Sequence, residues 1–130
     1  NTYVDKDKSK LSSGMVERLH EAQAMSVDDY RQDIMRREEI RAAYASLANK
    51  AECCITLSAP DVAPVGLDST GNPIFVVQGS LLGVPTLSLP LITLHGLPLG
   101  IQMLGFLDED AALFAHAAAV EPAIGPIEIA

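Results

Sequence analysis

The segment GSLLGVPTLSLPLITLHGLPLGIQMLG, residues 79–105, contains no Asp, Glu, Lys or Arg. Two short apolar runs within it, Thr86–Ile92 and Leu99–Leu104, have the composition of buried β-strands. A turn is expected around His95-Gly96-Leu97-Pro98, where Gly and Pro interrupt the apolar pattern. Because so much apolar surface is unfavourable in water, the segment must pack inside a body of protein. It predicts a sheet core and contains no obvious reactive group.

The length and the charge distribution of the chain limit its size and its partners. Its 130 residues suffice for one domain with one hydrophobic core. The formal net charge is -8, and all nine Lys and Arg lie between Lys6 and Lys50. From Ala51 onward no cation could neutralise phosphates, so neither nucleic acid nor an anionic membrane is an expected partner. No apolar run approaches the roughly 20 residues of a membrane span, and the polar start Asn1–Lys10 is unlike a secretory signal.

The charged first half predicts two helices. The first is expected to be capped by Ser13, to end near Met25, and to carry on one side Met15, Val16, Leu19 and Ala22. Ser26, followed three residues later by Asp29, predicts the start of the second helix. This helix is expected to run to about Asn49 with an apolar stripe formed by Tyr30, Ile34, Tyr44 and Leu47. Its many Arg and Glu residues indicate a solvated face with short-range ion pairs.

The second half predicts strands, a long loop and a final helix. Cys53–Leu57 is expected to form a short buried strand, and the loop SAPDVAPVGLDSTGNP follows it. Loops of that length tend to be functional or to wrap around something. Ile74–Leu82 fits a strand or a helix, and the glycine stop in Leu82-Gly83-Val84-Pro85 favours a helix. The last helix is expected to start with a cap at Asp108 and to end at Glu121-Pro122.

The cysteine and histidine residues do not indicate a metal site or a catalytic site. Cys53 and Cys54 are adjacent and would point to opposite faces of a strand, so we interpret them as reduced core residues of a soluble, cytoplasmic protein. The three histidines have no ligand spacing around the cysteines, so no metal or cofactor is expected. His20 and His116 are interpreted as surface or packing residues. His95, in a turn, keeps a conceivable functional role.

An ordered set of motifs resembles the C-terminal portion of enzymes of the amidase signature family. The motifs are DDYRQDIMRREEIR, ITLSAPDVAP, STGNPIF, and LLGVPTLSLPL followed by GLPLGIQMLG and an Asp-led helix. The family's turn, strand and loop pattern is matched, in order, by Leu81, Leu82, Gly83, Pro85, Pro90, Gly96, Leu97, Pro98, Gly100 and Gln102. The family's usual residues are replaced here by Glu52, Leu57 and Gly79. Each motif alone is weak, but the ordered set spans nearly the whole chain.

The resemblance implies an α/β fold in which helices of the first half cover a small mixed sheet built from the second half, with the last helix packed beside them. Residues 1–130 would form a single C-terminal piece of an amidase domain, with a charged helical part at 1–52 and strands, loop and final helix at 53–130. Enzymes of this family hydrolyse carboxylic amides, or transfer their ammonia, with a Ser nucleophile, a second Ser in a cis peptide and a Lys base. Those residues belong to a Gly- and Ser-rich region upstream, so no catalytic residue is expected in this chain.

The segment KLSSGM, residues 10–15, imitates that catalytic set without the surrounding glycines. A Ser nucleophile requires a base that is held within hydrogen-bond reach, and a Lys beside an exposed terminus would stay protonated. We therefore interpret Ser12 and Ser13 as the start of a helix.

By the same resemblance, the loop Ser58–Pro64 approaches the acyl side of an amide substrate. Ser58, Ala59 and Pro60 are thus the expected substrate-binding residues. Two alternatives remain, a non-catalytic binding or regulatory module and a part of the A-type component of a glutamyl-tRNA amidotransferase, which would have protein partners. If the rest of the sheet is absent, the apolar edges from Thr86 to Leu104 must be hidden in another way, so a homo-oligomer or chain exchange is expected.

Overall fold

The computed structural model describes residues 6–129 and has an α/β fold, which confirms the predicted helices on a small mixed sheet. In chain order the elements are a 3₁₀ helix at Lys8–Lys10, α1 (Ser13–Ala24), α2 (Val27–Ala45), a 3₁₀ helix at Ser46–Asn49, β1 (Cys54–Leu57), α3 (Val76–Leu82), β2 (Thr86–Leu94), β3 (Leu97–Leu104), α4 (Asp110–Ile124) and β4 (Ile127–Ile129). Residues 1–5 of the predicted polar start lie outside the described part. No helix among the described residues has the length and apolar character to cross a membrane. The chain divides into two compact units at Arg36/Arg37, and each is described by itself.

Serine caps start both helices of the first unit. The Ser12 hydroxyl accepts a hydrogen bond from the Met15 backbone N at 3.3 Å, so the cap of α1 lies one residue before the predicted Ser13. At the start of α2, the Asp29 backbone N donates to Ser26 Oγ at 3.1 Å, and the Ser26 hydroxyl donates to the Asp29 carboxylate at 2.7 Å. These bonds satisfy groups that a helix start leaves unpaired, which confirms the predicted cap.

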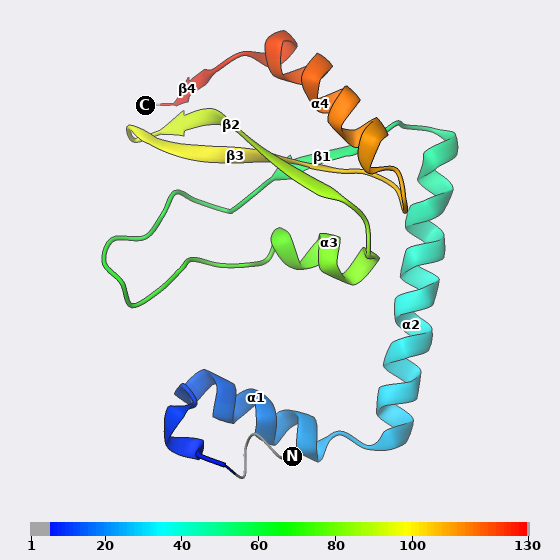
Figure 1. The fold of residues 1–130 in the computed structure, drawn as a ribbon, viewed down its shortest axis with the longest axis vertical. Coiled ribbons are helices and arrows are strands. Elements are labelled where there is room, and N and C mark those ends of the chain that lie inside the picture. Colours follow the sequence, from blue (N-terminus) through cyan, green and yellow to red (C-terminus); the bar gives the residue numbers. More distant parts are fainter. Residues whose placement is uncertain (1–5, 130) are drawn as a thin grey trace. The chain divides into compact units, whose positions relative to one another are not determined.

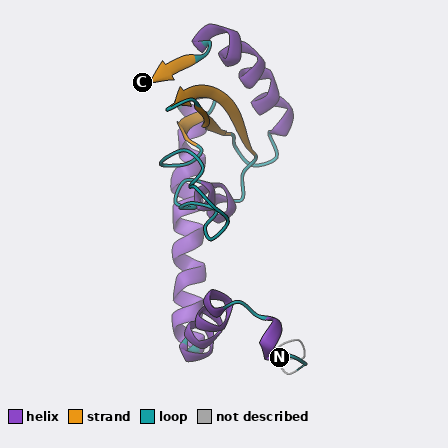
Figure 2. Cartoon of the chain, turned by 90° about the vertical axis from the view of Figure 1, so that its left-hand side faces the viewer, coloured by secondary structure: helices purple, strands orange, loops and turns teal. Residues whose placement is uncertain are grey.

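The second unit is built on a sheet with strand order β1-β3-β2-β4 (Figure 1). β3 lies inside the sheet and is antiparallel to both β1 and β2, whereas β4 runs parallel to β2. The register of β2 and β3 shifts between Leu89 and Ile92. Such an irregularity bends a strand and increases its twist, and the strands curl in Figure 2. β4 (Ile127–Ile129) was not predicted from the sequence.

The turn between β2 and β3 is tighter than the sequence predicts. β2 ends at Leu94 and β3 begins at Leu97, so only His95 and Gly96 lie between them. Their φ angles are 53° and 76°, and positive φ at both central residues is what a two-residue hairpin turn of this kind requires. Leu97 and Pro98 therefore belong to β3.

The hydrophobic core lies on the face of the sheet that α4 covers. Met103 of β3 is fully buried and shares one cluster with Leu113 and Ala117 of α4. Because side chains alternate along a strand, Leu99 and Ile101 lie on the same face, where they extend the core toward the hairpin turn. Figure 1 places α4 and α3 on opposite sides of the sheet. The last helix thus covers the core, and the prediction that helices of the first half would cover it is wrong for this face of the sheet.

Both ends of α4 differ from the prediction. Asp108 has a φ of 62° and lies before the helix, which starts at Asp110 without a side-chain cap. Pro122 lies inside the last turn, and the helix continues to Ile124. A proline there removes only one late hydrogen bond, and the chain leaves the helix at Gly125, whose N donates to Glu121 O at 3.1 Å.

Tyr44 connects the end of α2 to the end of β3 through hydrogen bonds. Its hydroxyl donates toward the carbonyl oxygens of Leu104 and Gly105, both at 3.1 Å, and its ring lies 5.3 Å from that of Phe106. Burial, with a contribution from the neighbouring Cys54, raises the pKa of Tyr44 above its ordinary value. The folded protein therefore keeps this phenol neutral where the unfolded chain would ionise it.

Replacement of Tyr44 by Phe is expected to lower the free energy of unfolding by about 1–3 kcal/mol, because buried carbonyl groups lose their donor. The stabilising effect of the raised pKa is complete below about pH 10 and decreases as the pH rises further, so wild type should lose stability above pH 10 more steeply than Tyr44→Phe. Urea unfolding between pH 7 and pH 11 measures both. Tyr30→Phe is the matched control, because Tyr30 is 57% exposed; equal losses for the two variants would contradict the assigned role.

Candidate functional site

The segment that follows β1 is held to two other strands. The Ser58 backbone N donates a hydrogen bond to Gly100 O of β3 at 2.8 Å. The Ser58 hydroxyl lies 2.5 Å from the Ser88 hydroxyl of β2, and either can be the donor. Ser58 is thus fixed to β3 through its backbone and to β2 through its side chain, and the loop begins from a defined position.

Gly100 makes the pairing of the two hydroxyls possible. β3 runs between β1 and β2, so a side chain on β3 at this point would separate Ser58 from Ser88. A Cβ atom on Gly100 would collide with both hydroxyl oxygens. Sterics therefore explain the glycine at position 100 of the GLPLGIQ motif, because groups from both neighbouring strands approach it closely.

A cavity of about 540 Å³ lies between the loop after β1 and the start of β3. Its lining includes the predicted Ala59 and Pro60, together with Gly100. Three polar side chains, Asp61, Thr70 and Asn72, also line it. A concave site of this size with a few polar groups is typical of small-molecule pockets. The structure brings Ala59 and Pro60 to this cavity, while Ser58 lies next to them and is engaged with Ser88.

The hydroxyl pair offers hydrogen bonds and no activated nucleophile. The described side-chain partners of Ser58 and Ser88 are each other. A serine attacks a carbonyl only when a base is positioned to take its proton. Within residues 6–129, no group of three or more His, Cys, Asp or Glu side chains could hold a metal ion. What the described residues supply here is a cavity with a few polar side chains, which is the usual composition of a ligand pocket.

The KLSSGM segment behaves as a helix start. Ser12 accepts the capping bond of α1, and Ser13 is the first residue of that helix. Lys10 forms an exposed ion pair with Asp7 at 3.7 Å.

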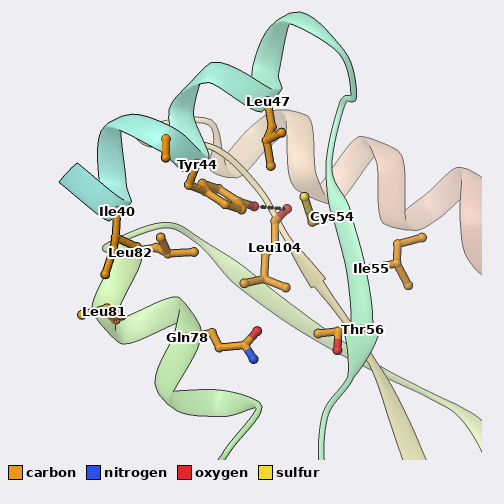
Figure 3. Close-up of a pocket in the computed structure, with 11 residues that line it drawn as sticks. Ile40, Tyr44, Leu47, Cys54, Ile55, Thr56, Gln78, Leu81, Leu82 and Leu104 are labelled. Carbon is orange, nitrogen blue, oxygen red and sulfur yellow. Dashed lines mark hydrogen bonds between the residues drawn. The ribbon is translucent and has the colours of Figure 1, made fainter. Parts of the chain in front are cut away.

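A second hollow, an apolar groove of about 540 Å³, lies beside β1 (Figure 3). Its walls come from the end of α2, the 3₁₀ helix after it, α3 and β1, and include Ile40, Tyr44, Leu47, Ile55, Leu81 and Leu82. None of its lining side chains is charged.

Two polar side chains connect α3 to the rest of the second unit. Gln102 of β3 is only 4% exposed, and its Nε2 donates to Phe75 O at 3.1 Å, at the entrance of α3. Arg41 of α2 donates through Nε to Leu81 O at 2.9 Å, near the other end. The helix then ends at Gly83, whose φ of 70° confirms the predicted glycine stop. Arg41 and Tyr44 were not identified from the sequence as contacts to distant elements.

None of the cysteines and histidines is among the residues that line the cavity beside Ala59 and Pro60. Cys53 and Cys54 are both free and half-buried. Burial, with Cys54 and Glu52 nearby, raises the pKa of the Cys53 thiol, which disfavours the reactive thiolate. His116 lies within α4, and its Nδ1 is 3.5 Å from the Glu52 carboxylate. His20 is exposed on α1, and His95 is exposed in the hairpin turn.

Gly100→Ala is expected to destabilise the chain by about 1–3 kcal/mol, because the added methyl group overpacks the space between Ser58 and Ser88. In the Ser58→Ala/Ser88→Ala background the same change should cost much less, since both oxygens that it meets are gone. Chemical unfolding of the four proteins gives the coupling free energy directly. Strict additivity would show that Gly100 does not serve the hydroxyl pair.

Comparisons with known proteins agree with this architecture. No protein-family model matches the chain. The A-type component of the glutamyl-tRNA(Gln) amidotransferase from Fusobacterium nucleatum is 31% identical over 97 residues, which cover 69% of this chain and 20% of that protein. Its counterpart from Anaplasma phagocytophilum is 28% identical over 98 residues, again with 20% of its length covered.

A crystal structure of an amidase superposes on 94% of this chain, with a TM-score of 0.77 and 27% identity, over 31% of the amidase. The chain thus spans about 20% of the length of these curated relatives. Together, the sequence relatives and the fold show that the chain belongs to the amidase signature family and is similar to the C-terminal part of its members.

Proposed function

We propose that this chain is the C-terminal part of an amidase that hydrolyses carboxylic amides to carboxylate and ammonia. The observation that carries the proposal is the agreement of 94% of the chain with a solved amidase at a TM-score of 0.77. The Ser, cis-Ser and Lys of the family's mechanism would lie in the part of the amidase outside this chain.

The proposed contribution of this chain is a wall of the substrate pocket. The cavity lined by Ala59 and Pro60 has a volume suited to a small amide, and Asp61, Thr70 and Asn72 offer polar contacts. Ser58 serves the pocket indirectly, because its bonds to Gly100 and Ser88 fix where the loop leaves the sheet. Residues 1–52 and 53–130 would act as one piece of the amidase domain.

A second candidate function is favoured by the sequence relatives, which are A-type components of glutamyl-tRNA(Gln) amidotransferases. In that case the ammonia released from an amide would be passed to a partner, and the chain would work together with other proteins. A non-catalytic module is the third alternative. Accumulation of free ammonia in the absence of partners favours the amidase, whereas amide cleavage that depends on partner proteins favours the amidotransferase.

We propose a cytoplasmic protein that self-associates when it is produced alone. The two neighbouring cysteines are free, as expected in a reducing compartment. Several large apolar side chains of the second unit are exposed, among them Ile55 at 53% and Phe114 at 63%. Exposed apolar surface of this kind promotes association.

A hybrid enzyme tests the proposed function. In it, this chain replaces the matching portion of the solved amidase, and release of ammonia from simple amides is measured. We expect turnover, and Ala59→Trp should raise KM at least about tenfold because the indole fills the cavity. Leu67→Trp is the matched control, since Leu67 is 101% exposed and lies outside the lining.

The 130-residue chain by itself is expected to release no ammonia from the same amides. Turnover by the chain alone that disappears on replacement of Ser12 or Ser13 would refute the proposed division of labour. A folded hybrid that cleaves no amide would do so equally.

A further inference from the structure

The outer edge of β1 is unpaired in the described sheet. β1 is the terminal strand of the order β1-β3-β2-β4, and its partner there is β3 on one side. An apolar end strand with free backbone groups is a template for pairing with another extended segment. Native proteins usually protect such an edge with charge, proline or a covering element. β1 has the sequence CITL, with neither charge nor proline.

The register identifies the backbone groups at this edge. Ser58 N bonds to Gly100 O, so the Ser58/Gly100 pair belongs to the hydrogen-bonded pairs of this antiparallel ladder. Hydrogen-bonded and non-hydrogen-bonded pairs alternate, which makes Thr56, opposite Gln102, a hydrogen-bonded residue as well. The N–H and C=O groups of Ile55 and Leu57 therefore point away from β3, toward the free edge.

The apolar groove opens beside the same strand. Figure 3 shows the Ile55 side chain on the opposite side of the β1 ribbon from Gln78 and Leu104, in agreement with its pairing to Met103. The residues that line the groove include Ile55, Leu81 and Ile40. These three side chains are 53%, 43% and 45% exposed. A covering element could thus pair with the backbone of β1 and bury apolar side chains in the groove at the same time.

We propose that this edge and groove form the docking face for the rest of an amidase domain, and that the occupant is an extended apolar segment contributed by that part. The inference rests on the proposed function. Its support is that the chain covers 31% of the matched amidase, so most of that protein lies outside the match and is available to cover the face. The lining of the groove is uncharged and mainly aliphatic, with Thr56 and Gln78 as polar side chains, which favours an apolar occupant over a charged one.

Co-expression tests the docking face. The tagged chain is produced together with the remaining part of the solved amidase, and recovery of that part on the tag is measured. We expect a one-to-one complex with the wild-type chain. Ile55→Pro should reduce recovery at least about tenfold, because it removes an edge N–H that β3 does not use. Leu81→Asp should do the same by placing a charge in the groove.

Phe114→Asp is the matched control, since Phe114 is 63% exposed on α4 and is absent from the groove lining. It should bind like wild type. Circular dichroism of each variant identifies one that has lost its fold, and Leu81→Asp then decides the outcome if Ile55→Pro unfolds. No complex with the wild-type chain, full recovery with both groove variants, or a chain dimer formed through β1 in place of the complex would each overturn the inference.

Amide hydrolysis by the reconstituted complex separates this inference from the proposed function. A complex that depends on Ile55 and Leu81 but cleaves no amide supports the docking face and contradicts the amidase proposal. A hybrid enzyme that is active, together with normal binding by both docking variants, supports the proposed function and contradicts the docking face.

Discussion

The antiparallel pairing of β3 with a strand on each side is the constraint on which the second unit depends. β3 places Met103 under α4 on one face, while on the other its Gln102 amide holds the entrance of α3 and its Gly100 leaves room for two hydroxyls. Tyr44 attaches α2 to the end of the same strand through the carbonyl oxygens of Leu104 and Gly105. A shift of β3 by one residue would exchange its two faces, so that Met103 would leave the core and Gln102 would enter it.

Local signals in the sequence predicted the elements whose causes are local. The Ser26 and Asp29 cap and the glycine stop at Gly83 depend on neighbouring residues, and both were predicted correctly. β4 was missed because Ile127–Ile129 becomes a strand only by pairing with the end of β2. The end of α4 was placed too early because proline was treated as a stop, although a proline in a last turn costs the helix one hydrogen bond.

The candidate site was only partly predictable, because some of its contacts join residues that are far apart in the sequence. The resemblance to the family indicated the loop that contains Ala59 and Pro60, and both residues line the cavity there. The pairing of Ser58 with Ser88 joins residues 30 positions apart, so no spacing in the sequence could indicate it. The groove beside β1 was not foreseen either, because it is formed by side chains from separate helices around one strand. Three residues of the uncharged segment 79–105 line this groove, namely Leu81, Leu82 and Leu104.

The central proposal is that the outer edge of β1 pairs with an extended segment from the rest of an amidase domain. Hydrogen exchange at individual amides of the isolated chain and of the reconstituted complex tests it most directly. In the isolated chain, kept dilute enough to be monomeric, the amides of Ile55 and Leu57 should exchange rapidly while that of Thr56 is protected, and all three should be protected in the complex. Protection of Ile55 and Leu57 in a monomeric isolated chain, or their continued rapid exchange in the complex, would contradict the claim.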